Sequence, residues 1–159
     1  MKKTLFLLIL AVYTLPGFAQ EINPTLIGKK FTAAISLEEK LKAKVYTSDD
    51  DIIIPGGMAA PIVYIRPNRS HENFYVQYTF SEQDSVIQRI EYKWGDDNDK
   101  KHLISKYELF LKSFNKRYGK AEAVGEYQCG WISKAQLEFS LYGNFGDEPF
   151  VSVGIRKKD

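Results

Sequence analysis

The clearest candidates for nucleophilic or acid–base chemistry in this sequence are Cys129 and the two histidines, His71 and His102. Hydrolysis by a thiol requires a base within hydrogen-bond reach of the sulfur. No local motif pairs Cys129 with either histidine. A small secreted hydrolase is therefore an alternative only if the fold brings at least two of these residues and a carboxylate into one pocket.

The stretch GEYQCGW, residues 125–131, contains the only cysteine of the chain, Cys129. This residue is too far from the N-terminus to be lipidated, and it has no partner for an intramolecular disulfide. Free cysteine is among the residue types most often buried. We expect Cys129 to be a buried structural thiol, with an intermolecular disulfide as the alternative. We expect the stretch itself to connect the long helix to the closing hairpin.

Metal and phosphate sites have little support in the sequence. A closed zinc site needs four ligands, and one cysteine with two distant histidines does not supply them. The acidic cluster 96–99 fails the EF-hand pattern because Lys101 stands where glycine is needed. It is better placed to cap a helix, and the cluster 49–51 is typical of a loop. The run PGGMAAP, residues 55–61, has no basic residue and indicates a turn. We predict no metal and no cofactor.

Aromatic side chains are the best candidates for a binding surface, because tyrosine and tryptophan bury a large area and keep a polar group. Tyr75 falls on the polar side of its predicted strand, and Trp94 falls at the end of the next one. Tyr127 and Trp131 follow the long helix. These four residues are the predicted binding residues, although aromatic residues also cover the edges of small cores.

The first residues, MKKTLFLLILAVYTLPGFAQ, have the three parts of a secretory signal peptide: a basic start, an apolar run and a small-residue cleavage site. The apolar run is shorter than the roughly 20 residues that cross a bilayer. We predict a signal peptide at 1–19, cleaved between Ala19 and Gln20, and one domain at 20–159. The mature protein is expected in the periplasm or outside the cell, without a lipid anchor or an integral membrane segment.

Charge gives no reason to expect nucleic acid as a partner. The chain has 22 basic and 20 acidic residues, and removal of Lys2 and Lys3 with the signal peptide leaves 22 − 2 = 20 against 20. The expected partner is a protein or a small ligand of the cell envelope.

Hydrophobic periodicity predicts the elements. Apolar residues recur every three or four positions over 99–118, which predicts one long amphipathic helix. Alternation predicts a hairpin at 74–80 and 86–94 and a second at 135–141 and 150–156. Before them, we expect a strand at 31–36, a short helix at 37–44 and a strand at 62–66, and we find no repeat of fixed period. The predicted fold is α+β: an antiparallel sheet of about four to six strands packed on the long helix, in the order hairpin, helix, hairpin.

Four segments carry a resemblance: IEYKW at 90–94, FNKRYGKA at 114–121, Trp131, and LEFSLY at 137–142. Together they resemble a class of small exported α+β proteins with no assigned activity, which brings no catalytic residues to this chain. We expect a non-catalytic binding module. The alternatives are the hydrolase and an inhibitor of a secreted enzyme, which needs a protruding loop such as 143–149 or 55–61.

Overall fold

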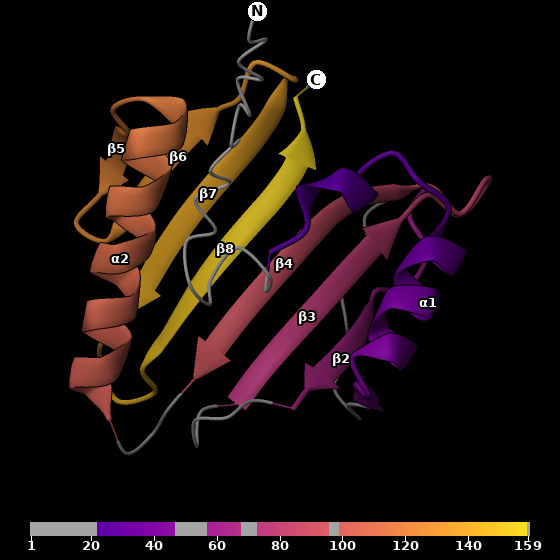
Figure 1. Cartoon of the computed structure of the whole chain (residues 1–159), viewed down its shortest axis with the longest axis horizontal. Helices are drawn as coiled ribbons and strands as arrows, with labels where there is room; N and C mark the ends of the chain where they lie inside the picture. Colours follow the sequence, from indigo (N-terminus) through magenta and orange to yellow (C-terminus); the bar gives the residue numbers. More distant parts are fainter. Residues whose placement is uncertain (1–21, 47–56, 68–72, 96–98, 159) are drawn as a thin grey trace, which may run out of the picture.

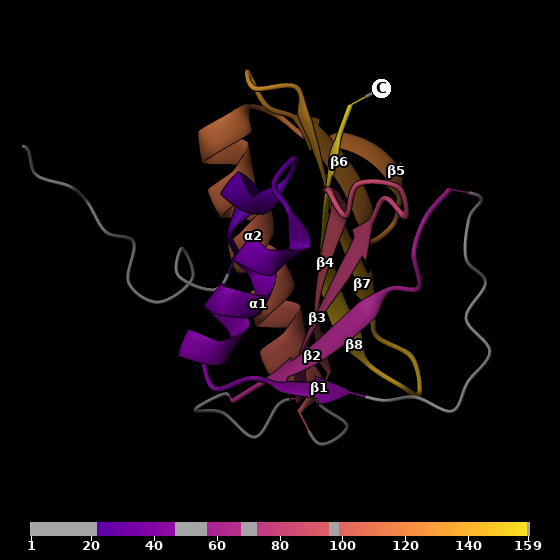
Figure 2. The same cartoon turned by 90° about the vertical axis from the view of Figure 1, so that its right-hand side faces the viewer.

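The computed structural model describes residues 22–46, 57–67, 73–95 and 99–158. In these residues, two helices pack on one face of a single antiparallel sheet of 8 strands (Figures 1 and 2). The predicted α+β class with an antiparallel sheet is therefore confirmed, but the sheet is larger than expected. The expected signal peptide, residues 1–19, lies outside the described residues.

Across the sheet, the strands follow the order β1-β2-β3-β4-β8-β7-β6-β5, so that β4 and β8 form its centre. The edge strands β1 and β5 are short, which limits edge-to-edge pairing with other chains. In chain order the elements are η1 (Pro24–Leu26), α1 (Phe31–Lys40), β1 (Lys44–Tyr46), β2 (Ile62–Arg66), β3 (Asn73–Phe80), β4 (Ile87–Gly95), α2 (Lys100–Tyr118), β5 (Glu122–Gly125), β6 (Gln128–Ile132), β7 (Leu137–Asn144) and β8 (Phe150–Lys157).

The two halves of the chain repeat one unit, a helix followed by four strands. In the first half, Arg66 of β2 pairs with Phe74 of β3. In the second half, Trp131 of β6 pairs with Phe139 of β7, at the same offset of 65 residues (131 − 66 and 139 − 74). Because β4 and β8 pair antiparallel in the middle, an approximate twofold axis relates the halves (Figure 1). This repeat was missed in the sequence, since equivalent positions hold residues as different as Arg66 and Trp131.

Helix α2 has nearly the predicted bounds, and local chemistry explains both ends. The Asp99 carboxylate accepts a hydrogen bond from the backbone N–H of His102 at 2.9 Å, which satisfies one of the free donors of the first turn. At the other end, Gly119 adopts a positive φ of 94°, a conformation that favours glycine. The predicted capping role of the cluster 96–99 is thus confirmed for Asp99, while 96–98 lie outside the described residues.

The N-terminal region differs most from the prediction. Residues 31–36 are helical, not a strand, and the helix expected at 37–44 is α1, which begins at Phe31 and ends at Lys40. Ser36 and Glu39 have the spacing of a capping box, but the helix formers on both sides of Ser36 extend the helix across it. Its buried face consists of Phe31, Ala34 and Glu38, at helical spacing. A glutamate on that face hid the amphipathic pattern.

Both predicted hairpins and the strand at 62–66 are present, as β3–β4, β7–β8 and β2. The stretch GEYQCGW, however, is more than a connector. It covers the turn between β5 and β6 and most of β6 itself, which pairs with β7. Sequence analysis missed β1, β5 and β6 because they are short and β5 is exposed along its whole length.

The core lies between the helices and the sheet (Figure 2). Trp94 is fully buried there, with its ring 4.8 Å from Phe74 and 4.9 Å from Phe110, centroid to centroid. Lys106, a charged residue of α2, is also buried. Its ammonium group lies 5.2 Å from the centre of the Trp94 ring, a cation–π contact that compensates part of the cost of burial.

Candidate functional site

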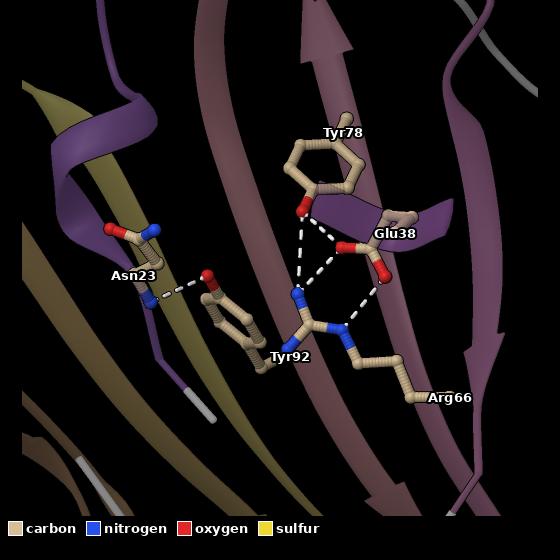
Figure 3. Close-up of polar contacts among 5 residues, drawn as sticks. All are labelled: Asn23, Glu38, Arg66, Tyr78 and Tyr92. Carbon is tan, nitrogen blue, oxygen red and sulfur yellow. Dashed lines mark hydrogen bonds and ion pairs between the residues drawn. The ribbon is translucent and has the colours of Figure 1, made fainter. Parts of the chain in front are cut away.

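A buried polar cluster joins α1 to the sheet (Figure 3). Arg66 donates from Nε to Glu38 Oε2 at 2.8 Å and from Nη2 to Glu38 Oε1 at 2.6 Å, a bidentate pair. The hydroxyl of Tyr78 donates to Glu38 Oε1 as well. Nearby, the Tyr92 hydroxyl accepts from the backbone N–H of Asn23 at 2.9 Å. The cluster thus ties α1 to β2 and β3, and Tyr92 of β4 holds the segment before η1.

The second half of the molecule has an equivalent contact. Trp131, at the position equivalent to Arg66, donates from Nε1 to Asn115 Oδ1 and to the Gly119 carbonyl oxygen, each at 3.1 Å. Glu38 and Asn115 both lie near the C-terminal end of their helices. A carboxylate is unfavourable at the negative end of a helix dipole, so the first half requires the cation of Arg66. Both contacts fix a helix to the second strand of its unit.

Perturbed pKa values often mark functional sites, but the hydrogen bonds of this cluster fix α1 to the sheet. Burial lowers the pKa of Arg66, but the hydrogen bond and charge of Glu38 outweigh it and leave this pKa above its ordinary value. Burial, and then the hydrogen bond to Glu38, raises the pKa of Tyr78. These side chains are buried and bond to one another, and neither hollow described below is lined by them. A substrate has no route to the cluster through either hollow.

This cluster predicts a loss of stability at high pH. Burial raises the pKa of both Tyr78 and Tyr92 above the ordinary value near 10, so the folded state keeps protons that the unfolded state releases. Stability is therefore full below about pH 10 and falls above it, by up to about 1.4 kcal/mol per pH unit for each tyrosine. Urea unfolding from about pH 8 to 11 measures the free energy of unfolding as a function of pH. Tyr92→Phe should reduce the decrease of stability per pH unit, and an unchanged urea midpoint up to pH 11 would contradict the prediction.

Cys129 is a free, buried thiol in the described structure, as predicted. Its sulfur lies 3.7 Å from the hydroxyl of Tyr107 on α2. Burial raises the pKa of this thiol, and the contact with Tyr107 offsets only part of the effect. A raised pKa is the opposite of what a nucleophilic cysteine needs. Of the two histidines, His102 lies in the first turn of α2, and His71 lies outside the described residues.

The burial of Cys129 predicts slow chemical modification. We expect a disulfide reagent to label the native thiol at least about 100-fold more slowly than the unfolded thiol, because labelling requires opening of the β6 region. A time course with and without denaturant measures the ratio. Native labelling at the rate of a free thiol, or a dimer band on a non-reducing gel, would contradict the buried-thiol interpretation.

The second face of the sheet has a different character, and no described helix covers it (Figure 2). Strand alternation places the polar half of β3, β4, β7 and β8 here, opposite the core half. We call this surface the open face. Its residues are of charged, polar, small, aliphatic and aromatic types: Tyr46, Val63, Ile65, Tyr75, Gln77, Arg89, Glu91, Lys93, Gln128, Gly130, Ile132, Glu138, Ser140, Tyr142, Phe150, Ser152, Gly154 and Arg156.

Aromatic pairs and two hollows stand out on the open face. Tyr46 packs edge-on against Tyr75, and Tyr142 packs edge-on against Phe150. One hollow, of about 350 Å³, is lined by Tyr75, Lys93 and Phe150 and by the turn before β8. The Lys93 ammonium group lies 4.2 Å from the centre of the Phe150 ring.

The larger hollow, of about 460 Å³, lies over β6, β7 and β8. Gly130, Ser140 and Gly154 are neighbours across these three strands and form its floor. A Cβ atom on Gly154 would lie 2.5 Å from Ser140 Oγ, so a larger residue at this position requires the Ser140 hydroxyl to rotate away. Arg89 and Arg156 line the side of the hollow. A floor of small residues beneath two arginines leaves space for a ligand group.

The structure does not bring the four predicted binding residues together. Trp94 and Trp131 lie in the core, which corrects the prediction that they form part of a surface. Tyr75 lines the smaller hollow of the open face. Tyr127 is exposed at the turn between β5 and β6, where it packs against Tyr107 and Phe145 on the helix side.

The larger hollow was not predicted, although the sequence pattern contains part of the signal for it. Glu138 and Ser140 fall on the polar side of one predicted strand, and Arg89 and Glu91 fall on the polar side of another. The register that makes them neighbours depends on the β4–β8 pairing, which joins strands about 60 residues apart and leaves no local pattern.

Comparisons of this chain with family models, curated proteins and solved structures found no match. The resemblance to small exported proteins therefore stays a prediction. Within the described ranges, no group of three or more histidine, cysteine, aspartate or glutamate residues could hold a metal ion. In the same part of the chain, no helix is both long and apolar enough to cross a membrane.

Proposed function

We propose that this chain is an exported, non-catalytic binding protein that holds its ligand or partner on the open face of the sheet. The observation that supports this most is the contrast between the two faces. The helix side is closed over a packed core, while the open face combines exposed aromatic side chains, paired charges and two hollows.

The burial of Cys129 favours a binding role over thiol hydrolysis, because its sulfur faces Tyr107 and has a raised pKa.

An inhibitor needs a loop that projects from the body of the protein. In the 143–149 segment, Phe145 folds back against Tyr107 and Tyr127. Of the 55–61 segment, residues 57–61 are described, and Met58 forms a β-bridge with Ser81. Both described segments are thus held against the fold.

A retention experiment tests the open face. The tagged protein is isolated from the native envelope fraction under mild conditions, and retained molecules are identified by mass spectrometry. Tyr142→Ser alters the open face, and Leu109→Ser is the matched control on α2, since the two side chains are 41% and 39% exposed. We expect a species that wild type and Leu109→Ser retain and Tyr142→Ser loses.

Circular dichroism confirms first that both variants are folded. The proposal fails if the retained species binds equally to all three proteins, because the open face is then not the binding surface. It also fails if Leu109→Ser alone loses the species, since binding then occurs on the helix side.

A further inference from the structure

The larger hollow of the open face has the features of an anion site, and we propose that it binds the carboxylate or phosphate group of a small amphipathic molecule. Arg89 and Arg156 hold the anionic group, and the apolar body lies along the β5–β6 side. This inference rests on the proposed function and specifies the chemistry of its ligand.

Two arginines stand directly opposite each other at the centre of the sheet. Arg89 of β4 and Arg156 of β8 are register partners, and strand alternation places both on the open face. Cβ atoms of such partners lie about 4.5–5.5 Å apart, and like charges at this separation destabilise a sheet. Each arginine has a carboxylate partner that offsets part of this repulsion, and an anion bound between the two guanidinium groups would offset more of it.

Each arginine has one carboxylate partner and further donors. Arg89 donates from Nη2 to Glu91 at 2.9 Å, and Arg156 donates from Nε to Glu138. A guanidinium group has five N–H donors, so each bond leaves others for a ligand. The fork of a guanidinium group matches the two oxygens of a carboxylate or phosphate.

Exposure shows which charge a ligand meets first. The side chains of Arg89 and Arg156 are 53% and 59% exposed, whereas those of their partners Glu91 and Glu138 are 32% and 28% exposed. The glutamates therefore lie deeper, and the guanidinium groups face solvent. At the rim, Lys120 and Glu122 have opposite charges and offset each other.

The hollow also has an apolar side, which favours an amphipathic ligand over a free inorganic ion. Val124 and Ile132 line it and are both exposed. Its volume of about 460 Å³ lies within the range of small-molecule sites, about 300–1,000 Å³. The floor of Gly130, Ser140 and Gly154 lets a flat or narrow group approach the sheet closely.

Titration with small probes followed by NMR tests the proposal. The probes are phenyl phosphate and benzoate, which are anionic, and benzamide and benzylamine, which are neutral and cationic. We expect the anionic probes to produce saturable shifts of the Gly130, Ser140 and Gly154 amides. The pair of phosphate and carboxylate probes distinguishes the two anionic groups.

The variant Arg89→Gln/Arg156→Gln should weaken anion binding at least tenfold. Lys93→Gln is the matched control, because it removes a cation from the same face but lines the other hollow. Thermal unfolding verifies that each variant is folded. Equal binding of benzamide, equal weakening by Lys93→Gln, or no saturable shift would overturn the proposal.

The probe titration and the retention experiment can fail independently of each other. If Tyr142→Ser loses a native species while the anionic probes fail to bind, the open face is the binding surface but its ligand is not this anion. If the probes bind through the arginines while every variant retains the same native species, the anion site stands and the proposed function fails.

Discussion

Glu38→Ala is expected to lower the free energy of unfolding by about 3–5 kcal/mol. Arg66 is buried and makes a bidentate pair with Glu38, so this substitution leaves a buried cation without its carboxylate. It also removes the acceptor of the Tyr78 hydroxyl. Urea unfolding followed by tryptophan fluorescence measures the loss.

Two further variants separate this effect from a general weakening of α1. Glu39→Ala changes the neighbouring exposed carboxylate and should cost within about 0.5 kcal/mol. The triple variant Glu38→Leu/Arg66→Met/Tyr78→Phe replaces the ion pair and the Tyr78 hydroxyl with apolar groups and should be more stable than Glu38→Ala, because neither charge of the pair remains buried. Equal stability of Glu38→Ala and Glu39→Ala would show that the pair contributes nothing.

Trp94→Ala is expected to cost about 3–5 kcal/mol, because it creates a large cavity beneath α2. The Trp94 ring stacks on Phe74 and contacts Phe110 and Lys106, so its removal weakens contacts to both the sheet and the helix. Urea unfolding again measures the change, and the remaining Trp131 reports it by fluorescence.

Trp94→Phe separates the packing of the ring from its polar atom. The described residues supply no acceptor for the buried Nε1–H of Trp94, so phenylalanine loses no hydrogen bond to them. We expect this variant to retain most of the stability that alanine loses. Tyr46→Ala, at an exposed aromatic residue of the edge strand β1, should cost less than about 1 kcal/mol. If Tyr46→Ala lowered the free energy of unfolding as much as Trp94→Ala does, the assignment of Trp94 to the core would be contradicted.

Long periodic elements were predictable from the sequence. The spacing of Leu103, Tyr107, Phe110 and Phe114 predicted the helix, and the alternation of apolar and polar residues predicted both hairpins. Short or atypical elements could not be predicted from the sequence. Helix α1 buries Glu38 in place of an apolar residue, and the partner that permits this, Arg66, is 28 residues away. A helix whose buried face includes a charge has no clear period.

The candidate site was predictable only in its parts. Tyr75 was assigned to the polar face of its strand, and the structure places it at a hollow of the open face. Trp94 and Trp131 were considered as surface residues because aromatic type alone does not distinguish a core from an interface. The arginine pair depends on the contact between the two halves of the chain, and no pattern within either half contains it.

Photo-crosslinking in the native cell tests the central claim, that the open face holds the ligand or partner, most directly. A photoreactive amino acid is placed either at Tyr142 on the open face or at Leu109 on α2, two positions of similar exposure. We predict an adduct from position 142 and none from position 109. An adduct from position 109 alone, or equal adducts from both, would contradict the claim.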